Sequence, residues 1–319
     1  MINTPRVLFW VKPEEVNHLD YVNSRNYLSK NSSDEDIESS IYSDHVYIEK
    51  KELTEILDAV KNLNFAPKGI GLELGSGCSA ISVELVKNNK NIEKIYAVEL
   101  VPNIIQNAAV KLIEINAVSD KVIPVLGNFD DIKLDDQTVD FVIEWDSLHH
   151  SFNLERTIQE SSRILKQGGQ LFAIDRSHWR ISRKRKAELE NQIYSKEFLL
   201  DKGLDINKVF TRAENGEHEY LLSDYLNALS KAGFSKVDYF ICLDPGFSIL
   251  KLALISSIPS KIRSRTKFHY IQTWPLRKIL IPVVLMNIFK IKRVGKFISL
   301  PRKPDSKRFQ LKTFIFATK

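Results

Sequence analysis

Four ionisable side chains, Glu144, Asp146, His149 and His150, closely follow the apolar stretch "VDFVI". An imidazole or a carboxylate can take a proton from a reacting group, and histidine titrates nearest to neutral pH. We therefore take His149, His150 and Asp146 as the candidate catalytic residues, with a histidine as the general base. The alternative is that one of the two histidines only fills space or caps the following helix.

Asp146 and His149 are also spaced like two ligands of a divalent metal ion. No further ligand set with convincing spacing completes such a site, so we expect no metal ion. The two cysteines, Cys78 and Cys242, have no metal-ligand spacing and cannot form a disulfide framework. A reducing compartment is therefore expected.

A glycine-rich stretch, "LELGSGCSA", stands between an apolar run and a helical pattern. Its Gly75, Gly77 and Ala80 fit the G-x-G-x-x-G/A pattern of a dinucleotide site, and Glu99 closes the next apolar run. Glycines let the backbone turn tightly and approach a ligand, and an acid at that place can bind ribose hydroxyls. The stretch predicts a nucleoside-binding loop, and a turn without a ligand is the alternative.

Short Val/Ile-rich runs alternate with helical patterns from residue 67 to 175, which predicts a doubly wound α/β domain with a parallel sheet. A helix over 48–63 leads into it, and the polar segment 29–40 is expected to be mobile. Beyond residue 176 we expect a polar helix over 181–200, a helix that begins near residue 220 and is stopped by Gly233, and two further strands.

Asp175 and His178 follow the fifth strand of the alternation, on the edge where ligands of open α/β sheets bind. They could face the substrate, with Arg176 or Arg180 binding a phosphate group. The alternative is that this segment is a solvated loop. The basic run after residue 182 is expected to be a charged helix face.

Six motifs in order resemble those of a class I S-adenosylmethionine-dependent methyltransferase of the small-molecule type, over residues 67–242 and 309–319. They are "ELGSGCS" (73–79), "YAVEL" with its acid, "GNFDDIKL" (127–134), "VDFVIEWDSLHHS" (139–151), "RILKQGGQLFAID" (163–175) and "LSKAGF" (229–234). The resemblance implies a Rossmann-like sheet with an antiparallel last strand and S-adenosyl-L-methionine as cofactor. It implies cofactor contacts from Glu73, Gly75, Ser76, Gly77, Glu99, Leu100, Asn128, Phe129 and Glu144.

The sequence departs from the family pattern at two places. Ser79 stands where the glycine motif has its last glycine, which could tighten or shift the loop, and Asn128 stands where the family has an aspartate near the adenine. Asparagine keeps an acceptor oxygen but loses a charge. Cys78 in the same loop is interpreted as a small buried packing residue.

The net charge of +6 conceals a division of the chain. Residues 245–319 hold 17 Lys and Arg against one acid, whereas the rest holds 29 basic and 39 acidic residues. Within 248–304, apolar blocks broken by Lys and Arg contain an uncharged run of only eleven residues (279–289), too short to cross a bilayer. This pattern favours an anionic membrane surface as partner, and nucleic acid is the less favoured partner. The alternative without a partner is a small helical subdomain that packs on the core.

We therefore expect an N-terminal helical cap (1–66), a cofactor-binding core (67–243) with an acceptor-side insertion (177–219), a basic amphipathic insertion (244–308) and a last core strand (309–319). The predicted function is O-methylation of a polar small-molecule or glycan acceptor that is lipid-linked or membrane-associated. The expected location is the cytoplasm, with peripheral attachment to the inner face of the membrane as a variant. An RNA methyltransferase and a non-catalytic binding protein of the same fold are the alternatives.

Overall fold

One mixed sheet forms the centre of the protein in the computed structural model, which describes residues 5–16, 27, 32–46, 65–178, 181–201, 211–242 and 311–319. The strands are β1 (Leu8–Phe9), β2 (Gly69–Leu74), β3 (Ile92–Glu99), β4 (Val122–Leu126), β5 (Val139–Trp145), β6 (Leu165–Ser177), β7 (Lys236–Cys242) and β8 (Leu311–Thr318). Their spatial order is β1-β4-β3-β2-β5-β6-β8-β7. Every neighbouring pair is parallel except β6 with β8 and β8 with β7.

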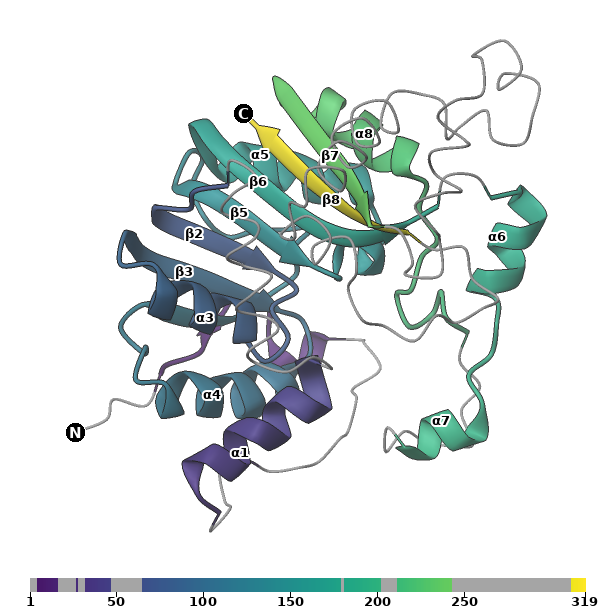
Figure 1. Ribbon diagram of the computed structural model, residues 1–319. Helices are drawn as coiled ribbons and strands as arrows, with labels where there is room; N and C mark the ends of the chain where they lie inside the picture. The colour runs from purple at the N-terminus through teal and green to yellow at the C-terminus, as the bar shows by residue number, and fades with distance from the viewer. Residues whose placement is uncertain are drawn as a thin grey trace, which may run out of the picture.

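Helices cover both faces of this sheet (Figure 1). On one face lie α1 (Asp34–Ile41), α3 (Ala80–Asn88), and η4 (Ile104–Ala109) with α4 (Val110–Ile115), which share an apolar core with Phe141 and Phe172 of the strands. On the other face, α5 (Leu154–Ile164) and α8 (Leu222–Lys231) pack on Leu72 and Val142. Two separate cores on the two faces confirm the predicted Rossmann-like, doubly wound sheet with an antiparallel last strand.

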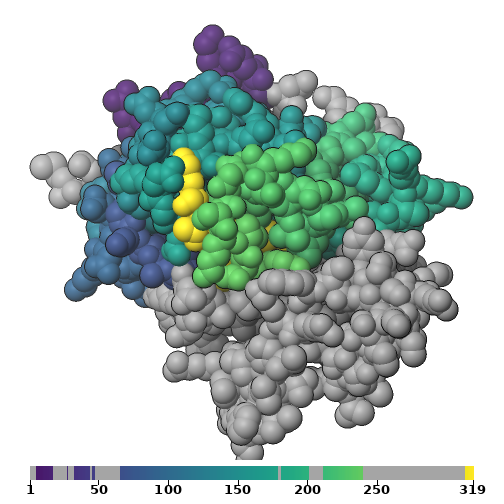
Figure 2. All heavy atoms as spheres, turned by 90° about the horizontal axis from the view of Figure 1, so that it is seen from above, coloured from purple at the N-terminus to yellow at the C-terminus, as the bar shows by residue number. Residues whose placement is uncertain are grey.

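The last strand lies inside the sheet, between β6 and β7. Figure 2 shows it in yellow, enclosed between teal and green segments. The basic insertion predicted for 244–308 falls between the end of β7 and the start of β8, and it lies outside the described residues. No helix among the described residues is long and apolar enough to cross a membrane.

The N-terminal region is more ordered than the sequence suggested. The prediction of a mobile segment over 29–40 was wrong for its second half, because α1 begins at Asp34. The Ser33 hydroxyl accepts a hydrogen bond from the Asp36 amide and caps the helix, and Ile37 and Ile41 are buried one turn apart. A short π-helix, η3 (Tyr42–Val46), continues the segment. The helix expected over 48–63 lies outside the described residues.

The polar segment after β6 also differs from expectation. Instead of one helix over 181–200, the structure has α6 (Arg183–Glu190) and α7 (Lys196–Asp201). The interruption has a local cause, because Ile193 pairs with Thr211 in an isolated bridge and the Gln192 carbonyl accepts a hydrogen bond from the Arg212 amide. The backbone groups of residues 192–193 that a continuous helix would use are therefore paired with residues 211–212 instead.

Candidate active site

A cavity of about 330 Å³ opens at the carboxyl ends of the central strands. Its wall is formed by the loop between β2 and α3, the residues after β5, the end of β6, Glu217, and His45 with Val46 of the N-terminal cap. Of the residues predicted from the sequence, the wall includes Glu73, Gly75, Ser76, Gly77, Asp146, His149 and His150. Glu99, Leu100, Asn128, Phe129 and Glu144 lie outside the wall.

The loop after β2 takes a left-handed backbone at three alternate residues. Gly75, Gly77 and Ser79 have φ angles of +62°, +52° and +64°. Only glycine adopts this region without strain, so the two glycines are explained by the backbone itself. At Gly75 there is also no room, because an added Cβ would stand 2.4 Å from the Ser147 Cβ. Ser79, the departure from the family pattern, keeps the left-handed conformation that a glycine would have there.

The carboxylate of Glu99 fastens this loop to the neighbouring strand. Its Oε2 accepts a hydrogen bond from the Gly77 amide at 2.9 Å, and its Oε1 accepts from the amides of Leu100 and Val101. The acid therefore lies beside the glycine loop, where the sequence placed a ribose-binding group. Asn128 accepts from the Asp130 amide in a local turn. The cofactor roles of these residues remain predictions.

Burial raises the pKa values of two groups beneath the loop, Glu73 and Cys78. Burial raises the pKa of Glu73 to about 8, although two hydrogen bonds from Ser82 act in the opposite direction. Burial likewise raises the pKa of Cys78 to about 12. Cys78 is 3% exposed, so its properties agree with the interpretation as a packing residue and not as a reactive thiol.

Glu144 supports the turn that carries the two histidines. It is fully buried, and its Oε1 accepts hydrogen bonds from the amides of Ser147 and Leu148. Burial, followed by the nearby carboxylate of Asp175, raises the pKa of Glu144 well above its usual range. The structure thus places Glu144 outside the cavity wall, where it holds the backbone of the turn.

Asp146 begins this turn in a strained conformation. Its φ is +59°, and its amide donates a hydrogen bond to the Ile174 carbonyl at 2.6 Å. A left-handed aspartate costs of order 1–3 kcal/mol and persists only where the surroundings enforce it. The reversal of the chain at Asp146 brings the short helix η5 (Leu148–His150) back over the end of β6.

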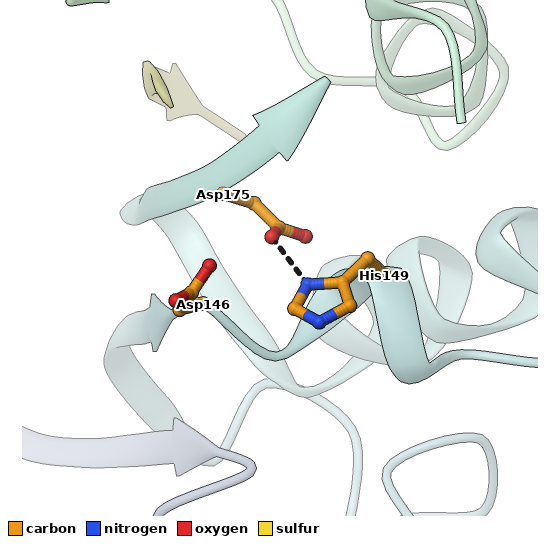
Figure 3. Close-up of side chains that lie close together, drawn as sticks. All are labelled: Asp146, His149 and Asp175. Carbon is orange, nitrogen blue, oxygen red and sulfur yellow. Dashed lines mark hydrogen bonds and ion pairs between the residues drawn. The ribbon is translucent and has the colours of Figure 1, made fainter. Parts of the chain in front are cut away.

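His149 of η5 and Asp175 of β6 form a buried pair (Figure 3). His149 Nδ1 lies 2.6 Å from Asp175 Oδ1, and the two residues are 4% and 2% exposed. A carboxylate can only accept, so Nδ1 carries the proton and Nε2 is the basic nitrogen. Asp175 is held in turn by the Tyr225 hydroxyl at 2.9 Å and by the Arg176 amide at 2.7 Å.

The second histidine of the motif, His150, lines the same cavity. Its ring centroid lies 4.3 Å from that of His149. The His149 ring is oriented by the carboxylate of Asp175. This contact supports His149 as the base, and the role of His150 stays a prediction.

Asp146, His149 and Asp175 could also hold a metal ion between them. One donor atom from each lies within 4.8 Å of the others. Such a mixed set of imidazole and carboxylates suits a transition metal. His149 and Asp175 also contact each other directly, through a hydrogen bond that needs no metal, and the expectation of a metal-free site stays a prediction.

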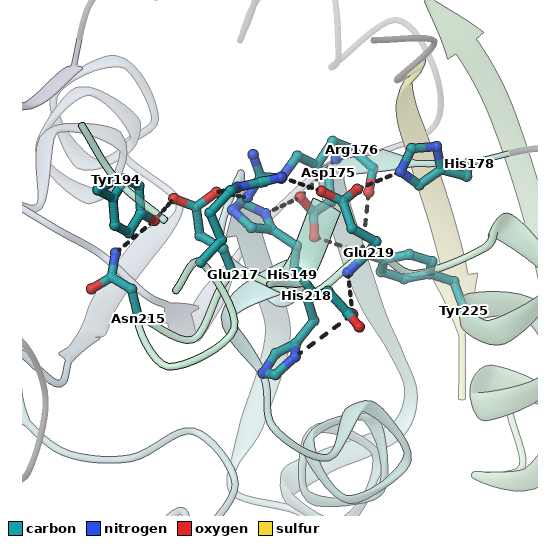
Figure 4. Close-up of polar contacts among 12 residues, drawn as sticks. His149, Asp175, Arg176, His178, Tyr194, Asn215, Glu217, His218, Glu219 and Tyr225 are labelled. Atoms are coloured by element: carbon teal, nitrogen blue, oxygen red, sulfur yellow. Dashed lines mark hydrogen bonds and ion pairs between the residues drawn. The ribbon is translucent and has the colours of Figure 1, made fainter. Parts of the chain in front are cut away.

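Beyond Asp175, alternating charges form a connected network (Figure 4). Arg176 donates to Glu217, Glu217 and Glu219 both accept from Arg212, and Glu219 pairs with His178. Asp175 and His178 are buried, so the alternative of a solvated loop at this place is wrong. Arg180, the other arginine considered for phosphate binding, lies outside the described residues.

Sequence reasoning missed several residues of this region. Tyr225 and Glu217 belong to no motif, and their roles depend on how α8 and the segment before it fold over the end of β6. The helical spacing of Leu222, Tyr225 and Leu229 marked an inward face of α8, but it gave no sign that the Tyr225 hydroxyl would meet a carboxylate.

Residues 72–173 match a family model described as a methyltransferase domain. The chain carries a methyltransferase domain. This match confirms the predicted family, a class I S-adenosylmethionine-dependent methyltransferase, and with it the predicted enzyme class and cofactor. No protein of curated function matches the chain.

Three solved methyltransferase structures are similar to this chain at low sequence identity. A putative methyltransferase from Bacillus halodurans is 16% identical, with a TM-score of 0.46 over 82% of this chain and 97% of that one. A putative sarcosine dimethylglycine methyltransferase from Galdieria sulphuraria is 15% identical, with a TM-score of 0.48 over 82% and 83%. Phosphoethanolamine N-methyltransferase 2 from Haemonchus contortus, in complex with phosphomonomethylethanolamine and S-adenosylhomocysteine, is 13% identical, with a TM-score of 0.47 over 82% and 51%. This chain therefore spans about half of the Haemonchus protein.

The half of the cavity beside the glycine loop fits the cofactor of the methyltransferase domain. A Cβ at Gly77 would meet no heavy atom within 4 Å, so bare backbone faces open space there. Glu73 and Trp145 line the cavity as well. A zwitterionic amino-acid group can bind to such a surface of amides and one acid.

Proposed function

We propose that the protein transfers the methyl group of S-adenosylmethionine to a hydroxyl of a polar acceptor, with His149 as the general base. The observation that carries this proposal is the 2.6 Å contact between His149 Nδ1 and Asp175 Oδ1 at the cavity wall. It supports one tautomer of His149 and directs its basic Nε2 away from the carboxylate.

S-Adenosylmethionine, when bound, supplies an electrophilic methyl group. The protein must then hold the acceptor oxygen in line with that methyl and remove the hydroxyl proton. His149 Nε2 takes the proton as the carbon–oxygen bond forms, and Asp175 stabilises the imidazolium that results. Tyr225 keeps Asp175 in place by donating to its second oxygen. Burial raises the pKa of Tyr225 well above its usual range, so this hydroxyl remains a donor.

The donor side of the cavity is assigned to residues that hold the cofactor. In this proposal Glu73 and the backbone of Gly75 and Gly77 bind its amino-acid group, and Glu99 binds its ribose. Asn128 and Phe129, from the segment after β4, border the adenine. The positions of these residues around one loop support this assignment. The Phe129 ring, for example, lies close to Gly75, because a Cβ added at Gly75 would be 3.7 Å from it.

The acceptor is proposed to be a sugar hydroxyl of a lipid-linked or membrane-associated glycan. This part rests on the sequence of 248–304, whose basic and apolar blocks suit an anionic membrane surface and peripheral attachment at its inner face. An RNA acceptor is the second candidate, since the same basic residues could bind phosphates. A non-catalytic role is the third, and the intact glycine loop and Glu99 contact count against it.

The test uses the full chain, methyl-labelled S-adenosylmethionine, and lipid, water-soluble and RNA fractions of one cell extract. We expect label to enter the lipid fraction, and a His149→Gln variant to bind S-adenosylhomocysteine in calorimetry but to transfer about 10²- to 10⁴-fold more slowly. The matched control is His218→Gln, whose side chain does not line the cavity. Full activity of His149→Gln would refute the general base, and label only in RNA would refute the glycan acceptor.

Two further measurements separate the alternatives. Flotation with anionic liposomes, with and without residues 248–304, tests the membrane surface; binding to RNA without binding to lipid would overturn it. Transfer after treatment with a chelator tests the metal alternative at Asp146, His149 and Asp175. Activity that is lost with the chelator and restored by one divalent ion would replace the general base by a metal mechanism.

A further inference from the structure

Arg176 brings an incompletely paired guanidinium to the cavity. It belongs to the end of β6, directly after Asp175, and its side chain is 19% exposed. Its Nη2 donates a hydrogen bond to Glu217 at 2.9 Å, whereas its Nε is buried without a partner. Nη1 has no hydrogen-bond partner among the described residues either. A guanidinium with two uncommitted nitrogens in a largely buried place is costly unless a ligand completes its bonds.

Glu217, the carboxylate that accepts the hydrogen bond of Arg176, is shared with other donors. Arg212 donates two hydrogen bonds to the same oxygen, at 2.7 and 3.1 Å, and the Tyr194 hydroxyl donates to the other oxygen. Burial alone would raise the pKa of Glu217, but Arg176 and then Arg212 hold it far below its usual range. One carboxylate thus serves two guanidinium groups and cannot satisfy all donors of Arg176.

The remaining acids near Arg176 are Asp175 and Asp146. Asp175 already accepts from His149, Tyr225 and the Arg176 amide. Both acids keep the guanidinium charged, because their charges, together with that of Glu217, raise the pKa of Arg176 against the effect of burial. Arg176 is therefore a permanent cation on the wall that also carries His149.

We propose that Arg176 forms an oxyanion subsite in the acceptor half of the cavity, which binds a carboxylate or phosphate group of the substrate. This inference rests on the proposed function, because it places the anionic group next to the hydroxyl that His149 deprotonates. Guanidinium groups bind carboxylates and phosphates through paired N–H donors in a plane, so the subsite orients the acceptor as well as attracting it.

Two contacts hold Arg176 in place relative to His149. The Arg176 side chain is anchored by Glu217, and the backbone next to Glu217 is tied to η5, because the His218 amide donates to the His149 carbonyl at 2.9 Å. The segment that contains Glu217 and His218 therefore contacts both the Arg176 side chain and the main chain of His149. An acceptor bound at Arg176 would have its hydroxyl fixed relative to His149, which is the condition for a fast in-line transfer.

The experiment titrates the full chain, saturated with S-adenosylhomocysteine, with inorganic phosphate and separately with acetate, followed by calorimetry. We expect binding in the millimolar range for the unaltered protein and at least tenfold weaker binding for Arg176→Gln. The matched control is Arg185→Gln, an arginine on α6 that is half exposed and paired with Glu188. It makes the same change of charge outside the cavity and should bind phosphate as the unaltered protein does.

Equal phosphate binding by Arg176→Gln and the unaltered protein would overturn the subsite. If Arg176→Gln does not fold, Arg176→Lys keeps the charge but loses the paired donors, and we expect binding that is weakened several-fold; undiminished binding there would likewise overturn the proposal. Binding of S-adenosylhomocysteine, measured in every variant, reports the state of the cofactor site. Absence of phosphate binding in the unaltered protein, with methyl transfer intact, would reject the subsite alone, whereas phosphate binding that depends on Arg176, without any methyl transfer, would reject the proposed function alone.

Discussion

The glycine loop and the segment 211–221 face the same cavity, but different interactions hold them. The loop is held by backbone groups: the Ser76 amide donates to the Val98 carbonyl, the Ser79 amide to the Ser76 carbonyl, and the Gly77 amide to Glu99. The segment 211–221 also has backbone hydrogen bonds, such as that of the Arg212 amide to the Gln192 carbonyl, but it adds a network of charged side chains, above all Arg212 with Glu217 and Glu219. A change of side chains can therefore alter the second wall of the cavity more easily than the first.

Of the substitutions that test this difference between the two walls, Asp175→Asn should have the largest effect on the rate of methyl transfer. The amide no longer favours the tautomer of His149 with its proton on Nδ1, so methyl transfer should fall about 10²- to 10⁴-fold. Binding of S-adenosylhomocysteine should change little, because Asp175 lies on the acceptor side of the cavity. An equal loss of cofactor affinity would show that the two sides are not independent.

The next largest effect separates two glycines of the loop. Gly75→Ala should destabilise the fold by about 3 kcal/mol, from the left-handed backbone and the collision with Ser147 together. Gly77→Ala should cost only about 1–2 kcal/mol, because the new Cβ meets no atom, yet it should weaken cofactor binding by occupying open space. Urea unfolding and calorimetry measure both. Equal destabilisation would contradict the backbone account of the loop.

Removing the hydroxyl that supports Asp175 tests the acceptor side. Tyr225→Phe leaves a buried carboxylate oxygen with one donor fewer, which should cost about 1–3 kcal/mol of stability and reduce transfer by about tenfold. The control is Tyr220→Phe, whose hydroxyl donates to the Ser151 carbonyl outside the pair. A loss of stability with the rate unchanged would restrict Tyr225 to a structural role.

Glu73 makes the donor side sensitive to pH. Its pKa in the folded protein is raised to about 8 from the ordinary value of 4.5, so between these values the folded state holds a proton that the unfolded state releases. Stability from this group is complete below 4.5 and is lost as the pH rises through 8, with a slope of up to about 1.4 kcal/mol per pH unit. Urea unfolding at pH 5.5 and 7.5 should show this slope reduced in Glu73→Gln, and an unchanged slope would assign it to other groups.

The smallest expected effect concerns the departure from the family pattern. Ser79→Gly relieves a left-handed conformation at the start of α3, and the gain is partly offset by the greater freedom of glycine in the unfolded chain. We expect stability to rise by up to about 1 kcal/mol, measured by urea unfolding. A destabilised variant would mean that the Ser79 hydroxyl, 3.5 Å from that of Ser76, contributes more than its backbone costs.

Much of the donor side could be predicted, because its signals are local. Glycines at the left-handed positions and an acid at the end of β3 stand in short motifs, so the turn at Gly75 and Gly77 and the place of Glu99 beside it could be predicted, while their contacts with the cofactor stay predictions. The acceptor side could be predicted only where a motif reached it, as at His149. Tyr225 and Arg212 escaped, since their partners lie far away in the sequence and are chosen by packing. The motif predicts a cofactor contact for Glu144. In the structure its buried carboxyl accepts a hydrogen bond from the Leu148 amide of its own turn.

The position of β8 has a consequence for how this protein is made. Asp175 lies opposite Thr313 in the pairing of β6 with β8, and β7 pairs with the far edge of β8. During synthesis the ribosome delivers the strands of the cofactor side first, and they can assemble while the edge of β6 is still open. β6, which carries Asp175, receives its neighbour only after β8 has emerged. Until then a nascent chain exposes unpaired backbone groups at the edge of β6, where chaperones or aggregation compete.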